Sequence, residues 1–127
     1  MSRTQNLGRR GEELAAEHLA RCGFRILQRN YRTRWGEIDI IAFDGRTLAF
    51  CEVKSRRARS SPGASAERPP FESLHARKRA RVRRIAKRWI SERFERPYAP
   101  FIRFDAIGVT FDWRDELVRL EHLEGAF

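Results

Sequence analysis

Two apolar runs separated by an Asp-Gly dipeptide constrain the fold of this chain more than any other feature. The first run, residues 37–43, reads EIDIIAF, and the second, residues 47–54, reads TLAFCEVK. Both runs are rich in the β-branched and aromatic residues that strands favour. Asp44-Gly45 between them is a strong hairpin-turn signal. The pattern therefore predicts an antiparallel β-hairpin over residues 37–54.

The same hairpin is expected to gather charged side chains on one face. Side chains alternate along a strand, so Asp39 lies on the same side as Glu37. A two-residue turn would place Asp39 diagonal to Glu52, and a four-residue loop would place it directly opposite Glu52. In either register Asp39, Glu52 and Lys54 converge. Only a loop with an odd number of residues, or a bulge, would separate them.

Carboxylates crowded beside one ammonium group indicate a metal site. Like charges repel, and partly buried acids must either bind a cation or take up protons. Oxygen ligands suit Mg²⁺, Mn²⁺ or Ca²⁺ better than Zn²⁺. The alternative is an exposed hairpin edge with ordinary surface charges, but Asp39 and Glu52 lie within apolar runs, which favours a site. The metal hypothesis requires both side chains to point to the same side of the sheet.

The length and the hydropathy pattern limit the class of protein. A chain of 127 residues is expected to form a single domain over residues 1–127, with a core that needs no disulfides. No apolar run approaches the roughly 18–20 residues of a membrane span. Residues 1–6 lack the apolar core of a signal peptide. A cytoplasmic location and no membrane partner are therefore expected.

Cysteine and histidine give no sign of a second site in the sequence. Cys22 and Cys51 are the only cysteines, and no CxxC motif or Cys/His cluster is present, so neither a disulfide framework nor a structural zinc site is predicted. His18, His75 and His122 are isolated, with no acidic or cysteine partner at ligand spacing. We expect these histidines to be structural or surface residues.

The positive charge is concentrated in the middle of the chain. The formal net charge is +10, and residues 56–96 contain 14 basic and 4 acidic side chains. Such an asymmetry is typical of proteins that bind polyanions. Nucleic acid is the expected partner, and an acidic protein that meets the basic segment is the rival.

Two amphipathic helices are predicted. In residues 8–22, Glu12 begins the apolar stripe, and it either complements the helix dipole or belongs to a site. In residues 72–95, Lys78 lies on the apolar stripe, where it either snorkels to solvent or reaches the carboxylates. The opposite face of this second helix carries seven cations, and an anionic partner such as phosphate is the expected counterweight: Arg77, Arg79, Arg81, Arg83, Arg84, Lys87 and Arg88.

The remaining segments complete an αβββαββ order in one compact α/β unit. Residues 24–27, 102–109 and 117–123 are predicted strands. Residues 30–36 alternate aromatic and basic side chains, which fits either contact with nucleic acid or a β-edge packed on the core. Residues 56–71 have the composition of a flexible loop.

The motifs together resemble the YraN-like uncharacterised proteins of bacteria, which are predicted endonucleases of the PD-(D/E)xK, or restriction-endonuclease-like, superfamily. The matching stretches cover nearly the whole chain: Gly8-x-x-Gly11-Glu12, Gly23-Phe24, Arg29-Asn30-Tyr31, Gly36-Glu37-Ile38-Asp39, Phe50-Cys51-Glu52-Val53-Lys54-Ser55-Arg56, Lys78, Ala86, Trp89 and Arg103-Phe104-Asp105. The chain departs from the family at Cys51, where valine is usual, and in the long loop after Arg56.

The resemblance implies a central mixed sheet flanked by helices, in a restriction-endonuclease-like αβββαβ core. It implies that Asp39, Glu52 and the Val53 carbonyl hold Mg²⁺ or Mn²⁺, that Glu12 adds a further acid, and that Lys54 positions or activates the attacking water. The expected activity is metal-dependent hydrolysis of DNA phosphodiesters in branched or structured DNA, since Holliday-junction resolvases are among the family's relatives.

The remaining predictions concern the binding of nucleic acid and the oligomeric state. Six basic residues are expected to hold nucleic-acid phosphates: Arg56, Arg57, Lys78, Arg81, Arg84 and Arg88. A resolvase-like reaction on two strands favours a homodimer. The alternative function is a nucleic-acid-binding module that keeps the nuclease fold and performs no chemistry.

Overall fold

A computed structural model describes residues 3–58, 76–93 and 99–127 of the chain. Within these ranges, one sheet has the strand order β1-β2-β3-β4-β5, in which β3 and β4 pair in parallel and the other neighbours are antiparallel. The elements follow one another along the chain as α1 (Arg3–Arg21), β1 (Arg25–Thr33), β2 (Gly36–Phe43), β3 (Thr47–Arg57), α2 (Ala76–Glu92), β4 (Phe101–Phe111) and β5 (Leu117–Leu123). The predicted mixed α/β fold and its αβββαββ order are confirmed.

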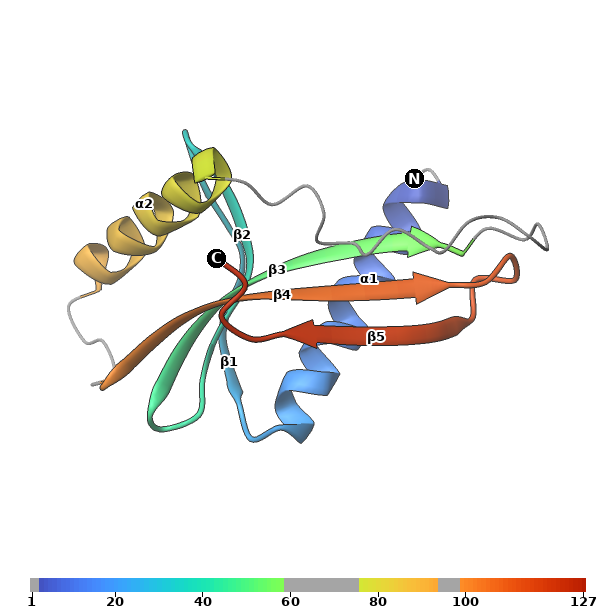
Figure 1. Ribbon diagram of the computed structural model, residues 1–127, viewed down its shortest axis with the longest axis horizontal. Coiled ribbons are helices and arrows are strands. Elements are labelled where there is room, and N and C mark those ends of the chain that lie inside the picture. The colour runs from blue at the N-terminus through green and yellow to red at the C-terminus, as the bar shows by residue number, and fades with distance from the viewer. Residues whose placement is uncertain (1–2, 59–75, 94–98) are drawn as a thin grey trace.

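The two helices cover opposite faces of the sheet (Figure 1). Because side chains alternate along each strand, the apolar side chains divide between the two faces of the sheet. Ala42 and Cys51 pack on the α1 side, and Ile41 and Phe50 pack on the α2 side. On the α2 side, the ring of Phe50 meets Trp89 edge-on at 5.8 Å between centroids. The central strands β2 and β3 are therefore buried on both faces, which explains their nearly continuous apolar runs.

The hairpin between β2 and β3 adopts the four-residue loop. The main-chain N–H of Asp44 donates to the Thr47 carbonyl at 3.3 Å, and Asp44 Oδ1 accepts from the N–H of Arg46 and Thr47. The resulting register pairs Phe43 with Leu48 and continues to the pair Ile40–Cys51. Of the two registers expected from the sequence, this is the one that would place Asp39 opposite Glu52.

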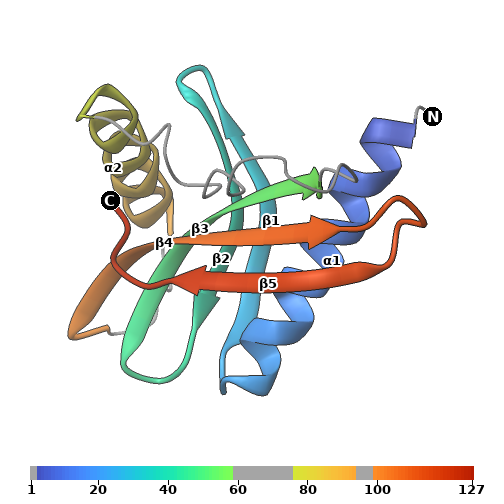
Figure 2. The ribbon, with the colours of Figure 1, turned by 45° about the vertical axis from the view of Figure 1, so that its right-hand side comes forward.

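The pairing of β2 with β3 ends at Ile40–Cys51, although both strands continue. Beyond that pair, residues 36–38 of β2 remain paired with β1, and residues 52–57 of β3 remain paired with β4. Figures 1 and 2 show the tip of the β1-β2 hairpin diverging from the C-terminal half of β3. We call this opening the fork. It is the feature around which the candidate site is built.

Several predicted element boundaries differ from those observed. α1 begins at Arg3, five residues before the expected start, and Cys22 at its end is exposed rather than inward-facing. β1 is longer than the expected strand at 24–27, since it runs to Thr33 and takes in most of residues 30–36. Residues 56 and 57 of the expected loop belong to β3, and residues 59–71 lie outside the described ranges. No helix in the described ranges is long and apolar enough to cross a membrane.

Candidate functional site

Three carboxylates from two elements meet beside the fork. One oxygen from each of Glu12, Glu37 and Asp39 lies within 4.8 Å of the other two. We call these three residues the acidic cluster. They line a pocket of about 990 Å³ together with Val53 and Ser55 of β3. The pocket lies on the α1 side of the sheet, since Glu12 comes from that helix.

A close approach between α1 and β3 positions Glu12. A Cβ atom on Gly11 would lie 1.8 Å from Ser55 Oγ and 3.0 Å from Ser55 Cβ, so only glycine allows this contact. Glu12 follows directly and is held at the wall of the pocket. It lies in the middle of α1, and no acidic residue occupies the first turn of that helix. Between the two roles expected for Glu12, the structure therefore excludes complementing the helix dipole.

Asn30 holds the two glutamates of the cluster together. Its backbone is in the left-handed region, with φ at 54°, a conformation that asparagine tolerates better than most residues. With the amide oriented to satisfy both acceptors, its side-chain nitrogen donates to Glu12 Oε1 at 2.8 Å and to Glu37 Oε1 at 2.7 Å. The sequence contained the Arg-Asn-Tyr motif, but nothing in it indicated that Asn30 would bridge two acids.

Asp39 lies at the base of the fork. The main-chain N–H of Val53 donates to Asp39 Oδ2 at 2.7 Å, just beyond the last backbone pair of the β2-β3 ladder. Burial raises the pKa of Asp39 to about 7, and repulsion from Glu12, Glu37 and Glu52 acts in the same direction, while the hydrogen bond from Val53 opposes it. Asp39 is thus partly protonated near neutral pH unless a cation neutralises the cluster.

The pKa of Glu12 is also raised above its ordinary value. Burial is the largest cause, and the charge of Glu37 adds to it, whereas the nearby Arg29 and a hydrogen bond with Asp39 lower the pKa. Arg29 is itself engaged by Glu13 at 2.7 Å, so it offsets only part of the negative charge. The cluster therefore retains an excess of negative charge in a partly buried pocket.

Glu52 is not one of the three acids of the acidic cluster. Its Oε1 lies 2.7 Å from the ammonium group of Lys78 and 3.4 Å from that of Lys54. Glu52 is absent from the pocket lining, and its partner Lys78 comes from α2 on the other face of the sheet.

The two acids nevertheless remain close neighbours. The charge of Glu52 contributes to the raised pKa of Asp39. The Oε2 atom of Glu52 is buried and has no hydrogen-bond partner among the described residues. Lys78 answers the alternative left open by the sequence: its side chain is 12% exposed and reaches a site carboxylate rather than solvent.

Basic and aromatic side chains form a surface beside this region. Arg81, Arg84 and Arg88 are exposed on α2, as predicted from the helical pattern. The guanidinium groups of Arg84 and Arg88 each lie 5.6 Å from the ring centroid of Trp35. Trp35 itself packs against the α2-side core, which agrees with the packing role expected for residues 30–36, and contact with nucleic acid stays a prediction.

Ion pairs engage predicted phosphate contacts on both α2 and β3, and on α2 Arg88 lies 2.7 Å from Glu92. Arg57 forms an ion pair with Asp115 at 2.7 Å, and its side chain is 30% exposed. Arg56 is partly buried and also has a partner. These two arginines lie on β3 beyond the fork, on the same strand as Lys54.

The chain matches the sequence model described as Uncharacterised protein family UPF0102 over residues 11–109. It is similar to a UPF0102 protein of Parafrankia sp. (strain EAN1pec), with 48% identity over 98% of each chain. A UPF0102 protein of Chlorobium limicola is 44% identical over 96% of this chain and 92% of its own. One from Acidothermus cellulolyticus is 40% identical, covering 99% and 96%. The names of these relatives state no activity.

Proposed function

The chain belongs to the uncharacterised protein family UPF0102, and we propose that it is a metal-dependent endonuclease of the PD-(D/E)xK superfamily that hydrolyses phosphodiester bonds in DNA. The single observation that carries this proposal is the acidic cluster at the base of the fork. Its three carboxylates crowd within 4.8 Å of one another, and Asp39 has a pKa near 7.

The donor set fits a hard divalent cation. Glu12, Glu37 and Asp39 offer only oxygen ligands, which suit Mg²⁺ or Mn²⁺. Val53 lies on the same pocket wall and can add its carbonyl oxygen. Glu37 takes the place in this set that the sequence had suggested for Glu52. A bound cation would supply charge that neutralises a phosphodiester and acidifies water near it.

Glu52 has a different role in this proposal. By binding Lys54 and Lys78 at Oε1, it holds two ammonium groups at the edge of the fork. Lys54 is 45% exposed and is free to reorient toward a substrate. Its ammonium group would orient the attacking water and offset negative charge at the phosphorus.

The basic surface supports binding of a long polyanion. Arg81, Arg84 and Arg88 are exposed on α2, and Lys78 points from that helix toward the fork. The phosphates that flank the scissile bond would meet the α2 arginines on one side and Arg56 and Arg57 on the other. A branched or structured DNA offers two duplex arms to such a split surface. Cutting two strands of a junction would require a homodimer.

The decisive experiment measures cleavage of linear and four-way-junction DNA with Mg²⁺, Mn²⁺ or a chelator present. Asp39→Asn and Lys54→Met are each expected to lower the cleavage rate by about 100-fold or more, because one removes a metal ligand and the other an activating charge. Glu17→Gln, an exposed acid on α1 outside the pocket, is the matched control and should retain full activity. Cleavage that survives both site substitutions would mark a contaminating nuclease and contradict the proposal.

A nucleic-acid-binding module without catalysis is the second candidate. The observation in its favour is that Glu52 Oε1 already lies 2.7 and 3.4 Å from two ammonium groups, which balance the charge of this acid without a metal ion. This candidate predicts that DNA binding is tight and steeply salt-dependent while no strand is cut with either metal. Binding that weakens by the same factor in Asp39→Asn and in Glu17→Gln would also favour it, since the acidic cluster would then have no special role.

A further inference from the structure

The last strand, β5, forms one border of the sheet. In the strand order β1-β2-β3-β4-β5, its inner edge is paired with β4, and no strand of the described residues is paired with its outer edge (Figure 2). Three of its apolar side chains face solvent, since Leu117, Val118 and Leu123 are 44, 55 and 43% exposed. An open edge with exposed apolar side chains is a template for pairing with a further strand.

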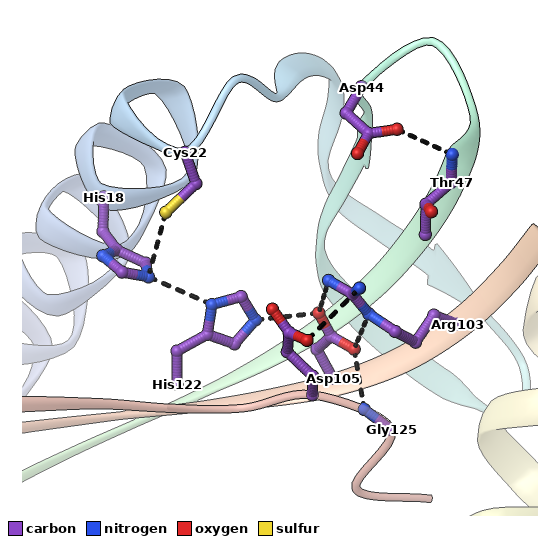
Figure 3. Close-up of polar contacts among 9 residues, drawn as sticks. His18, Cys22, Asp44, Thr47, Arg103, Asp105, His122 and Gly125 are labelled. Carbon is purple, nitrogen blue, oxygen red and sulfur yellow. Dashed lines mark hydrogen bonds and ion pairs between the residues drawn. The ribbon is translucent and has the colours of Figure 1, made fainter.

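Hydrogen bonds to buried groups hold the end of β5 in place. His122 Nε2 lies 2.8 Å from Asp105 Oδ2 on β4, and His122 Nδ1 lies 3.0 Å from His18 Nε2 on α1 (Figure 3). Asp105 is fully buried and also accepts hydrogen bonds from the Arg103 guanidinium and from the Gly125 N–H, just beyond the strand. The outer edge of β5 is therefore presented on a strand that is fixed to the rest of the fold.

These contacts also decide the expectation for the histidines. His122 has an acidic partner in Asp105, and Cys22 Sγ lies 3.7 Å from His18 Nε2, so the expectation that they lack acidic or cysteine partners is wrong. Their expected structural role agrees with the contacts. His75 lies outside the described residues.

The charges on β5 are complementary to those of a second copy of the same strand. Arg119 and Glu121 are two residues apart, so both side chains point to one face, and Arg119 Nε lies 2.7 Å from Glu121 Oε1. If two copies pair in antiparallel fashion about a two-fold axis at Leu120, Arg119 of each copy lies opposite the partner's Glu121. Opposite charges in directly facing positions stabilise an antiparallel strand pair.

Charge also selects this register over its neighbours. An axis at Arg119 or at Glu121 would place like charges directly opposite each other, which destabilises a strand pair. The axis at Leu120 instead brings Leu117, at one end of the strand, opposite the partner's Leu123, so that two exposed leucines cover each other. Leu120 itself packs on the α1-side core and would meet its own copy at the axis.

The charge around β5 favours the approach of a second copy. The chain as a whole carries +10, but residues 99–127 contain 3 basic and 6 acidic side chains, so two copies repel each other less here than elsewhere. Edge strands that avoid pairing commonly carry lysine, proline or an uncompensated charge, and β5 reads LVRLEHL. It does contain a bulge at Val118, which has no partner on β4, but residues 119–123 pair regularly.

We propose that β5 is a homodimer interface, in which two copies of the chain pair in antiparallel fashion about a two-fold axis at Leu120. The same surface then serves both copies, as in most symmetric dimers. Because this axis is perpendicular to the sheet, α1 of both copies lies on one face of a continuous sheet, and both acidic clusters open on that face. Dimerisation does not depend on nuclease activity. The presentation of two metal pockets to one DNA is the consequence that rests on the proposed function.

The test measures the oligomeric state of the full-length protein by sedimentation equilibrium. A chelator and about 0.15 M salt are present and DNA is absent, so the result is independent of cleavage. The wild type is expected to dimerise with a Kd on the order of 10–100 μM, because pairing along one short strand buries a small area. Arg119→Glu and Glu121→Arg each place four like charges around the axis, and each should raise the Kd about 10-fold or more.

The matched control is Arg25→Glu, at an exposed position on β1, the opposite border of the sheet. It changes the net charge by the same amount as Arg119→Glu and should dimerise like the wild type. Because Arg119 and Glu121 are 45 and 38% exposed, their variants are expected to fold, which circular dichroism checks.

Charge exchange separates strand pairing from any general effect of the substitutions. The double variant Arg119→Glu/Glu121→Arg again places opposite charges face to face and should recover most of the dimerisation. An equimolar mixture of the two single variants should form a heterodimer, because an acidic strand then faces a basic one. A wild type that stays monomeric up to about 1 mM, a Kd that neither single variant changes, or a mixture that stays monomeric would each overturn the proposal.

Discussion

Asp39 and Glu52 are neighbouring acids whose charges are balanced in different ways. Glu52 has two ammonium partners, at 2.7 and 3.4 Å. Asp39 has only the Val53 N–H and two further acids beside it. Electrostatics within a few ångströms therefore makes one acid a stable partner in an ion pair and leaves the other near its titration point. The consequences for the stability of the protein can be measured separately for Asp39 and for Glu52.

Asp39 should make the metal-free protein less stable as the pH rises. Its pKa is about 7 in the folded state and near the ordinary 3.8 when unfolded, so between these values the folded state binds more protons. Stability therefore falls from about pH 4 to pH 7 and then levels off, by a few kcal/mol at most. Urea unfolding in a chelator at pH 5, 6, 7 and 8 should show this slope in the wild type and a flatter one in Asp39→Asn.

Glu17→Gln serves as the control for that measurement and should keep the wild-type slope. Addition of Mg²⁺ at pH 8 should restore stability to the wild type more than to Asp39→Asn, because a cation replaces the missing proton. Parallel pH profiles for the wild type and Asp39→Asn would contradict the assignment of the titrating group.

The two lysines that bind Glu52 should differ in their contribution to stability. Lys78→Met is expected to lower the free energy of unfolding by about 2–4 kcal/mol, since it strands a partly buried carboxylate whose Oε2 already lacks a partner. Lys54→Met should change it by about 1 kcal/mol or less, because Lys54 is 45% exposed and more distant. Chemical denaturation of both variants, matched in the substituted residue, tests the ranking, and equal losses would refute it.

Among the elements, the packing of α1 on β3 decides where Glu12 lies. Gly11 permits the contact, since any side chain there would overlap Ser55. The fork then supplies the other two acids, Glu37 and Asp39. Both precede Ile40 in β2, in the part of that strand that is no longer paired with β3. The acidic cluster thus depends on two backbone arrangements, a close helix–strand approach and an early end to strand pairing.

Gly11→Ala should therefore displace α1 and weaken the site, while Gly8→Ala should not. The added methyl group at residue 11 would meet Ser55 Oγ at 1.8 Å, and we expect a loss of about 1–3 kcal/mol in stability. At residue 8 a Cβ meets nothing within 4 Å, so alanine should stabilise the helix by about 0.5–1 kcal/mol. Thermal denaturation and Mn²⁺ affinity are the readouts.

Ser55→Gly in the Gly11→Ala background is the rescue variant, because it removes the atoms with which the new methyl group collides. It should recover most of the Mn²⁺ affinity. A Gly11→Ala protein that binds Mn²⁺ as tightly as Gly8→Ala would show that α1 does not position a metal ligand.

At the scale of the whole molecule, the positive charge and the acidic cluster occupy different parts of the surface. The net charge is +10, yet the pocket at the fork is acidic and α2 presents its arginines nearby. A polyanion is attracted to the molecule as a whole and repelled by the pocket until a cation is bound there. Substrate and metal are therefore expected to bind cooperatively if the nuclease proposal holds.

DNA binding should depend steeply on salt through α2. Replacing Arg81, Arg84 and Arg88 by alanine is expected to weaken binding and to reduce the slope of log K against log salt by roughly 2–3. The charge-matched control replaces three exposed arginines away from α2: Arg21, Arg25 and Arg114. Fluorescence anisotropy from low to high salt distinguishes the two, and identical slopes for both triple variants would contradict a role for α2.

The sequence alone determined the elements, their order and the hairpin. Hydrophobic periodicity, the Asp44-Gly45 turn and the cationic helix face are local features, and each was observed as predicted. Local alternation also implied that Asp39 and Glu52 lie close together, and the charge of Glu52 does raise the pKa of Asp39. It did not indicate that Glu52 would pair with Lys54 and Lys78. The strands separate after Ile40–Cys51, and no short-range pattern encodes where a ladder ends.

Tertiary structure decided which acids and histidines became partners. Glu12 joined Glu37 and Asp39 because α1 packs closely on β3. His18 met His122 across 104 residues of sequence. Such pairs depend on the packing of distant segments, whose register is set by burial over the whole sheet rather than by spacing along the chain. The sequence by itself therefore determined the scaffold, and long-range packing determined the chemistry that the scaffold carries.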